Sequence, residues 1–257
     1  MSNILVCIKR VPDTGGEVSL TDDAMNVDDR QLGSTVSGHE ECAIELAVQQ
    51  ANETEGEVTV LTLGDEDSVE QLRDAVARGC TSAVLVEATP TAFGPRDIAH
   101  AIADVVRTHE AAGKTYDLIL LGNDAADTGD FQVGVRLGYA LGRPVVTGMS
   151  TIGIQGEQVV ARGDAPTGGT QVFEVALPAI VTVMEGGVEP RYPTIPGRMK
   201  AKRAKIETIE PSVDPIGSAR VRLTLPPKPP SQVTILGEGA DAAPAVADLL
   251  QELGVLR

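Results

Sequence analysis

The tract from Gly122 to Gly134 holds the residues whose types and spacing point most directly to chemistry. It reads GNDAADTGDFQVG, and it lies between an apolar run typical of a strand and the start of a helical pattern. In an open parallel sheet, ligands bind beyond the carboxyl ends of the strands, where the start of a helix offers unpaired N–H groups. We therefore expect Thr128, Gly129 and the amides near 131–133 to hold a phosphate group.

The aspartates of this tract, Asp124, Asp127 and Asp130, fit a different part of a ligand. A carboxylate repels phosphate at close range, but it accepts hydrogen bonds from ribose hydroxyls or caps a helix. The alternative interpretation is a turn rich in Asp and Gly that caps a helix and binds nothing. The pattern by itself leaves both interpretations open.

The stretch from Glu189 to Arg203, EPRYPTIPGRMKAKR, is the least ordinary in composition. Its closely spaced prolines predict an exposed loop that displays Ile195, followed by the start of a basic helix. In an otherwise acidic chain, this pattern fits a docking loop with an apolar anchor and a basic flank for an acidic partner. The alternative is a stiff linker followed by a solvated basic helix.

The overall composition excludes several functions. The 257 residues include 37 acidic and 21 basic ones, for a formal charge of −16, and only 2% are aromatic. Nucleic-acid binding needs concentrated Lys and Arg or aromatic stacking platforms, so it is not expected. No apolar run approaches the roughly 18 residues of a membrane-spanning helix. The N-terminus does not resemble a signal peptide or a presequence, and we expect a cytoplasmic protein.

No constellation for catalysis or metal binding can be assembled from the sequence. There is no Ser/His/Asp or Cys/His arrangement for nucleophilic chemistry and no P-loop. We expect no metal, because no metal-spaced pair occurs among the histidines His39, His100 and His109. The cysteines lack C-x-x-C spacing and are interpreted as core residues in a reducing compartment: Cys7, Cys42 and Cys80.

Apolar runs alternate with helical stripes over the first 142 residues. The runs predict buried strands at Ile4–Lys9, Val58–Leu63, Ala83–Glu87 and Leu118–Gly122. The stripes predict helices with apolar faces at 43–51, 69–76, 98–106 and 133–141. This β-α-β-α order predicts an α/β fold with a doubly wound, mainly parallel sheet.

The pattern changes after Pro144. Strand-like runs follow at 145–154, 158–162, 171–176 and 179–184, and they either extend the same sheet or add an antiparallel edge to it. From Glu189 onward proline is frequent, so the tail is not expected to be sheet core. A short helix with apolar residues at 246–253 has too little to bury alone. We therefore expect an extended C-terminal arm that lies on the surface of a partner subunit.

These residues carry a resemblance that covers essentially the whole chain. The sequence resembles the β subunit of electron transfer flavoproteins. The matching motifs, in order, are VCIKRV at 6–11, EECAIELA at 40–47, the 122–134 tract, LPAIVT at 177–182 and the segment at 189–202. The last segment is highly specific.

The resemblance implies a fold, a function and partners. It implies an adenine-nucleotide alpha-hydrolase-like α/β domain at 1–205, and a C-terminal arm and helix at 206–257 that pack on the partner subunit. The chain would be the non-catalytic β subunit of a heterodimer whose α subunit carries a redox-active FAD. The complex would take electrons from flavoprotein dehydrogenases and pass them to a quinone reductase or similar acceptor.

The resemblance also implies site residues. A structural AMP would lie among Cys7, Ser37, Gly38, His39, Leu63, Gly64, Asn123, Asp124, Asp127, Thr128, Gly129, Asp130, Phe131, Gln132, Val133 and Gly134. Partner recognition would fall to Arg191, Tyr192, Ile195, Met199 and Lys200. Two alternatives stay open: a flavin-bifurcating complex with a second FAD in this pocket, and a stand-alone adenine-nucleotide-binding module.

Overall fold

The computed structural model describes residues 1–13, 15, 18–227 and 233–256. The chain divides into two compact units, Met1–Leu223 (unit 1) and Thr224–Arg257 (unit 2), which are described separately. The part of the predicted arm at 228–232 lies outside the described residues. Within the described ranges, no helix is long and apolar enough to cross a membrane.

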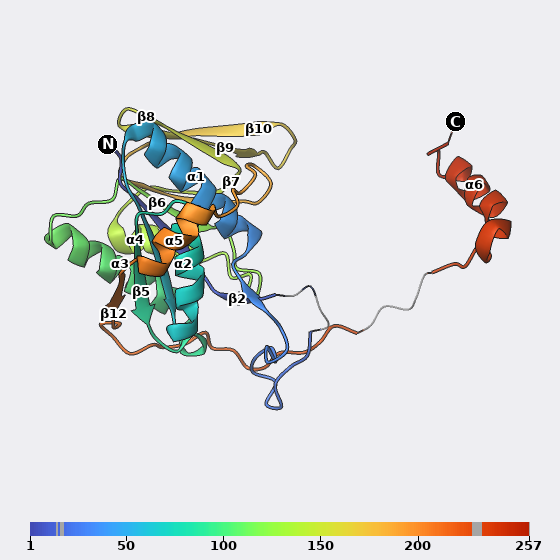
Figure 1. Ribbon diagram of the computed structural model, residues 1–257, viewed down its shortest axis with the longest axis horizontal. Helices are drawn as coiled ribbons and strands as arrows, with labels where there is room; N and C mark the ends of the chain where they lie inside the picture. Colours follow the sequence, from blue (N-terminus) through green and yellow to red (C-terminus); the bar gives the residue numbers. More distant parts are fainter. Residues whose placement is uncertain (14, 16–17, 228–232, 257) are drawn as a thin grey trace. The chain divides into compact units, whose positions relative to one another are not determined.

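Unit 1 is built on a parallel sheet of seven strands in the order β12-β5-β4-β1-β6-β11-β7 (Figure 1). The strands are β1 (Ile4–Ile8), β4 (Val58–Gly64), β5 (Ser82–Glu87), β6 (Leu118–Gly122), β7 (Val145–Met149), β11 (Ala179–Val183) and β12 (Ile206–Ile209). Every residue of β1, β4 and β11 is buried, because helices cover both faces of the sheet. This explains their mainly apolar sequences.

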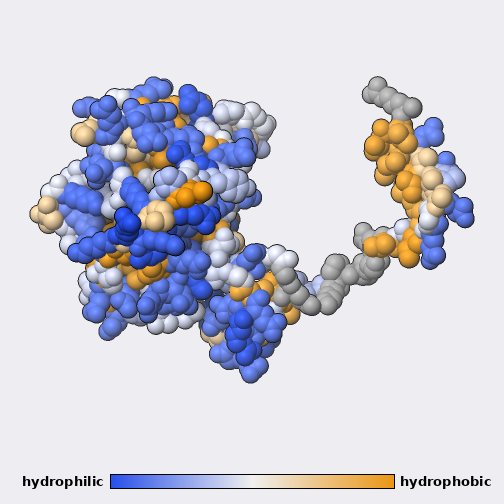
Figure 2. Space-filling view, in the orientation of Figure 1, coloured by the Kyte–Doolittle hydropathy of each residue, from blue (hydrophilic) through white to orange (hydrophobic). Residues whose placement is uncertain are grey.

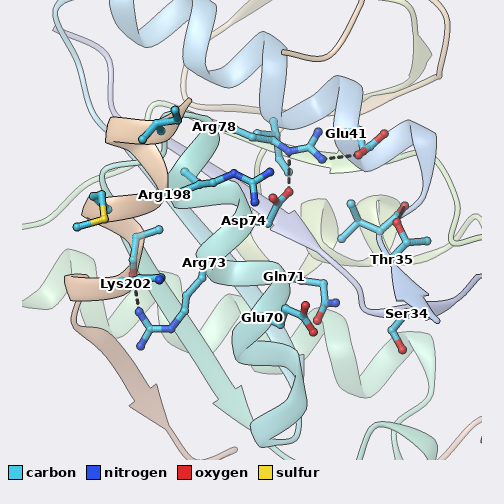
Figure 3. Close-up of a pocket in the computed structure, with 16 residues that line it drawn as sticks. Ser34, Thr35, Glu41, Glu70, Gln71, Arg73, Asp74, Arg78, Arg198 and Lys202 are labelled. Carbon is cyan, nitrogen blue, oxygen red and sulfur yellow. Dashed lines mark hydrogen bonds and ion pairs between the residues drawn. The ribbon is translucent and has the colours of Figure 1, made fainter. Parts of the chain in front are cut away.

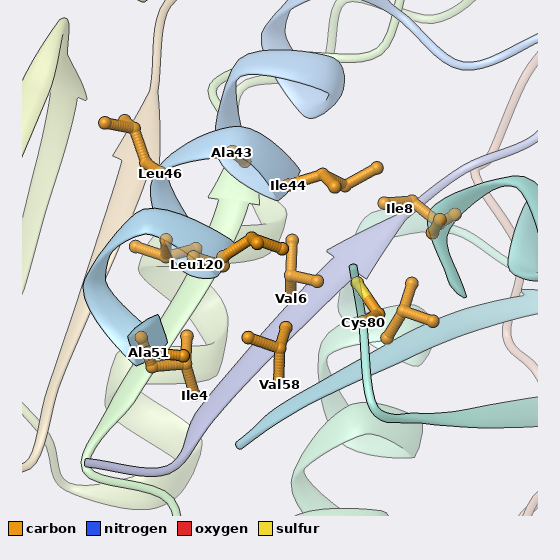
Figure 4. Close-up of a cluster of buried hydrophobic side chains, with 14 of the residues drawn as sticks. Ile4, Val6, Ile8, Ala43, Ile44, Leu46, Ala51, Val58, Cys80 and Leu120 are labelled. Atoms are coloured by element: carbon orange, nitrogen blue, oxygen red, sulfur yellow. The ribbon is translucent and has the colours of Figure 1, made fainter. Parts of the chain in front are cut away.

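Helices pack on both faces of this sheet. They are α1 (Gly38–Thr54), α2 (Val69–Arg78) and α5 (Ile195–Arg203) on one face, and α3 (Pro95–Ala111) and α4 (Val133–Leu141) on the other. Successive residues of a strand point to opposite faces. Val6 therefore packs with Ala43 and Leu46 of α1 (Figure 4), whereas Leu5 belongs to the core under α3 and α4. The predicted doubly wound α/β fold is confirmed.

A second sheet accounts for most of the strand-like pattern after Pro144. It is antiparallel and contains β8 (Thr151–Gln155), β9 (Gln158–Asp164) and β10 (Thr170–Ala176). The prediction that these runs belong to the main sheet is right for β7 and β11 and wrong for β8–β10. β8 instead lies against α1, where Ile154 N donates to Gln50 Oε1 at 2.6 Å. A two-stranded pair, β2 (Val11–Pro12) and β3 (Ser34–Thr35), and the short turns η1 (Glu66–Ser68) and η2 (Pro90–Ala92) complete unit 1.

The start of the predicted arm lies in the main sheet. The sequence assigns residues from 206 onward to the arm, but β12 pairs with β5 along its whole length. An edge strand is compatible with nearby prolines, because one side of its backbone needs no partner. The chain after β12 stays on unit 1, where Ile216 N and Gly217 N donate to Asp97 Oδ2 at 3.1 and 2.8 Å.

Unit 2 contains η3 (Gly239–Ala242) and α6 (Ala243–Glu252). None of its described residues is buried. Apolar side chains of α6 are exposed along one face, among them Val246 and Leu249 (Figure 2). A short helix with an open apolar face has no core of its own to stabilise it.

Candidate nucleotide-binding site

The predicted nucleotide residues come together at the carboxyl edge of the main sheet. In the sheet register Cys7 lies beside Leu121, and Val183 lies beside Gly122. Leu63 and Gly64 end the neighbouring strand β4. The loop from Asn123 to Gln132 leaves from the same edge and leads into α4. The topology thus brings residues far apart in sequence to one place.

The start of α1 lies against this loop. His39 Nδ1 is 3.1 Å from Asp124 Oδ1, although the two atoms are not aligned as a hydrogen bond. Gly122 makes the approach possible, because a Cβ there would lie 2.7 Å from Glu40 Cγ. The predicted segments Ser37–His39 and Asn123–Asp124 are therefore adjacent.

Lys9 is a site residue that the sequence analysis missed. Its Nζ donates to Asp127 Oδ1 at 2.7 Å and lies 3.4 Å from Thr128 Oγ1. Lys9 follows β1 directly, and a cation immediately after a buried strand was the available signal. Arg10 is the next residue, and its guanidinium lies 3.9 Å from Asp67 beyond the end of β4. Each of these two cations is thus paired with a carboxylate at this edge.

Asn123 is fixed by a relay of hydrogen bonds. Thr182 Oγ1 of β11 donates to Asn123 Oδ1 at 2.6 Å and accepts from Gly148 N at 3.0 Å. Thr182 also contacts the start of α4, since a Cβ on Gly134 would overlap Thr182 Cγ2. Thr182 is a second residue that sequence reasoning missed, and as a buried Thr on an apolar strand it gave only a weak signal.

The middle of the loop is a tight turn. Gly129 N donates to Ala125 O at 2.9 Å, and Gly129 has a φ of 57°. Phe131 also has a positive φ, 54°, a conformation that is uncommon for a bulky residue, and its side chain is 59% exposed. Gln132 is already engaged, because its Oε1 accepts from Arg136 at 2.7 Å. Val133 and Gly134 then start α4, whose first amides have no partner within the helix.

The groups beneath the loop are buried and structural. Burial raises the pKa of the Cys7 thiol, which keeps it protonated. Burial also raises the pKa of Glu40 to about 8, although hydrogen bonds from Ser37 oppose this shift. Ser37 N and Oγ lie 3.1 and 3.2 Å from Glu40 Oε2 and close the start of α1. Among the described residues no cluster of His, Cys, Asp and Glu could hold a metal ion.

Two buried nitrogen atoms at this edge test whether a ligand fits. Arg10 Nε and His39 Nδ1 have no hydrogen-bond partner among the residues that the structure describes. A buried polar atom without a partner is costly, so such atoms often mark the position of a ligand or water. With the open amides of α4 and the Lys9 ammonium, they make an edge suited to a phosphate and to hydroxyl groups.

Comparisons with known proteins show the family to which the chain belongs. A family model described as the electron transfer flavoprotein domain matches residues 24–214. The electron transfer flavoprotein subunit beta of Bacillus subtilis is 33% identical over 258 residues, covering 97% of each chain. That of Syntrophomonas wolfei is 30% identical over 249 residues, covering 96% of this chain and 95% of the relative. The chain belongs to the electron transfer flavoprotein family. Its relatives are electron-carrier subunits, and this membership implies a role in electron transfer.

In this member of the electron transfer flavoprotein family, the predicted recognition loop is partly helical. α5 already begins at Ile195, because Thr194 Oγ1 accepts from Gly197 N at 3.1 Å and Pro196 suits the first turn. Ile195 is 81% exposed and Tyr192 88% exposed. The expectation of an exposed apolar residue is confirmed, whereas the expectation that Ile195 lies in a loop is wrong.

The other predicted recognition residues lie on or near α5. Met199 and Lys200 are exposed, whereas the guanidinium of Arg191 is bound to Glu45 within the chain. Met199 and Ile195 border an open cavity of about 650 Å³ between α5, α2 and the start of α1. Figure 3 shows Arg198 extending from α5 over α2, and Arg78 bridging Asp74 and Glu41.

Proposed function

We propose that this chain is the β subunit of a heterodimeric electron transfer flavoprotein and holds AMP at the carboxyl edge of its main sheet. The companion α subunit would carry the FAD, which supplies the redox chemistry. The complex would take electrons from flavoprotein dehydrogenases and deliver them to a quinone reductase or similar acceptor. The observation that carries this proposal is the meeting of Lys9, His39 and the Asn123–Gly134 loop in a chain of this family.

The residues at this edge divide between the parts of the nucleotide. The first amides of α4 and the Lys9 ammonium would hold the phosphate, because both favour negative charge. Asp124 and Asp127 would accept hydrogen bonds from the ribose. The protonated, buried Cys7 would form part of the floor. Each role is one of binding, so the nucleotide would stabilise the fold and no reaction would occur on it.

Two further features support the assignment to a heterodimer in the cytoplasm. The described residues of unit 2 have exposed apolar side chains and no buried ones, as expected of an arm that packs on another subunit. The cysteines Cys7, Cys42 and Cys80 are all free and buried, which fits a reducing compartment.

The deciding experiment identifies the bound nucleotide. The complex is purified without added nucleotide and denatured, and the released small molecules are identified by mass. AMP in about equal amount to the complex, together with one FAD, supports the proposal. Two FAD and no AMP would instead support the bifurcating alternative. A stable monomer that binds adenylate and associates with no α subunit would favour the stand-alone module.

A further inference from the structure

The segment that leads from β11 to α5 runs along one face of α1. Gly38, Cys42 and Glu45 share this face, because residues three and four apart on a helix are neighbours. Each contacts a successive part of the segment. A Cβ on Gly38 would contact the side chain of Glu185, and Cys42 Sγ donates to Val188 O at 3.4 Å. Glu45 binds Arg191, so α1 and the segment are joined from the nucleotide edge outward.

The Glu45–Arg191 contact closes this row with a two-pronged ion pair. Arg191 Nε donates to Glu45 Oε2 at 2.6 Å, and Arg191 Nη2 donates to Oε1 at 2.8 Å. The Arg191 main-chain N–H also donates to Oε2, at 3.1 Å. Gln49 Nε2 adds a further hydrogen bond at 2.7 Å, and Glu45 is only 5% exposed. Both Glu45 oxygens are therefore engaged, and the pair fixes side chain and backbone together.

The few residues between Arg191 and Ile195 allow little freedom. Pro193 has a fixed φ angle, and Tyr192, the residue before it, is biased toward extended conformations. At its far end α5 packs on α2, where Arg73 donates to Ala201 O. Fixing Arg191 therefore sets where Ile195 and the first turn of α5 are presented.

We propose that Glu45 and Arg191 are a positioning pair. They hold the segment between β11 and α5 in place, so that Ile195 is already in its docking position when the donor dehydrogenase binds. This inference rests on the proposed function and on the docking role that the family resemblance implies for Ile195. Arg191 thereby affects docking by fixing the segment. Its guanidinium binds Glu45 and would not contact the dehydrogenase. Releasing the pair leaves the segment to be ordered during docking, and this ordering has a cost in free energy. The expected consequence is weaker docking with unchanged electron transfer once docked.

The test compares variants of the whole flavin-loaded heterodimer as the electron acceptor of a dehydrogenase. The variants are Glu45→Gln, Arg191→Gln and Ile195→Ala, and the control is Glu41→Gln. Glu41 is a matched control because it also lies on α1 and its carboxylate also binds an arginine at 2.7 Å, but this arginine, Arg78, belongs to α2 and not to the segment. Arg191→Gln covers the case in which Glu45→Gln fails to fold, since the Arg191 side chain is the more exposed of the two.

Two measurements are made on each variant. The first separates kcat from KM for the heterodimer, and the second is amide hydrogen exchange in the peptide that contains Arg191. We expect Glu45→Gln and Arg191→Gln to raise KM about three- to tenfold at unchanged kcat, because the segment must then be ordered during docking. Exchange in the peptide should rise, and flavin content should change no more than in Glu41→Gln.

The outcomes distinguish this inference from the proposed function. If Ile195→Ala raises KM and neither member of the pair does, the positioning role is wrong and the docking role stands. If Ile195→Ala leaves KM unchanged, the docking role fails, and the positioning inference fails with it. Faster exchange at unchanged KM would also overturn the inference, since the pair would then be only structural.

Discussion

Lys9 and Asp127 are 118 residues apart in sequence, and their side chains meet at 2.7 Å. The contact joins the end of β1 to the loop before α4, so it bridges two of the elements that border the proposed nucleotide site. Side chains of both residues are largely shielded from solvent. The ion pair holds the Lys9 ammonium next to the unpaired amides at the start of α4, where this cation would also bind a phosphate.

The first prediction concerns this cation. Lys9→Met should weaken retention of the adenylate about tenfold or more, because a charge-assisted hydrogen bond contributes about 1.5–3 kcal/mol. A ligand bound only to the folded state stabilises it, so the melting temperature should fall as well. The measurement is nucleotide content by mass after purification, with melting curves in the presence and absence of added AMP.

Lys205→Met is the matched control for Lys9→Met, because it removes the same charge from an exposed position between α5 and β12. Its nucleotide content should equal that of the unchanged protein. Equal nucleotide content in Lys9→Met and Lys205→Met would show that the cation at the sheet edge has no part in binding.

The second prediction concerns the close contact between α4 and β11. Gly134→Ala would place a Cβ against Thr182 Cγ2 and should reduce the free energy of unfolding by about 1–3 kcal/mol, the usual cost of overpacking. Gly153→Ala is the control, since a Cβ there meets nothing within 4 Å. Denaturant unfolding of both variants measures the difference. Equal midpoints would mean that α4 is not packed tightly on Thr182.

Local sequence patterns were sufficient to predict the central strands. β1, β4, β5 and β6 lie between layers of helices, so each is a continuous apolar run with boundaries close to those predicted. β8–β10 were recognised as strands but assigned to the wrong sheet. Alternation of side chains reveals a strand, whereas its partner is decided by contacts distant in sequence, such as that of Ile154 with Gln50.

The candidate site shows the same division. Its loop could be located from the Asp- and Gly-rich tract, because turn residues and helix starts leave local signals. The side-chain contacts of the site could not be predicted in this way. Lys9 and Asp127, like His39 and Asp124, become neighbours only through the order of the strands in the sheet. The left-handed backbone of Phe131 also had no signal, because an aromatic residue is not expected there.

The third prediction concerns the pH dependence of stability. The pKa of Glu40 is raised by burial to about 8 from an ordinary value of 4.5. Between these two values the folded chain keeps a proton that the unfolded chain has lost, so this group's contribution to stability falls as the pH rises. The contribution is fully present below pH 4.5 and is lost as the pH approaches about 8.

Glu40→Gln removes the titration and keeps an oxygen that can accept from Ser37. The free energy of unfolding of the unchanged protein should therefore fall relative to that of Glu40→Gln as the pH rises from 5 toward 8. Denaturant unfolding at several pH values in this interval measures it. A difference that does not vary with pH would mean that Glu40 is ionised in the folded protein throughout.

The last prediction concerns unit 2. Ending the chain after Leu223 should change the thermal midpoint of the isolated subunit little, because unit 1 contains both apolar cores and no described residue of unit 2 is buried. Association with the α subunit should weaken strongly, since the apolar face of α6 would be lost.

A milder variant, Leu249→Ser, should also weaken association, whereas the control Asp248→Ser should not. Sedimentation of each variant mixed with the α subunit measures association. Unfolding of the truncated subunit on its own would show that unit 2 belongs to the fold of this chain, and unchanged association would show that another surface joins the subunits.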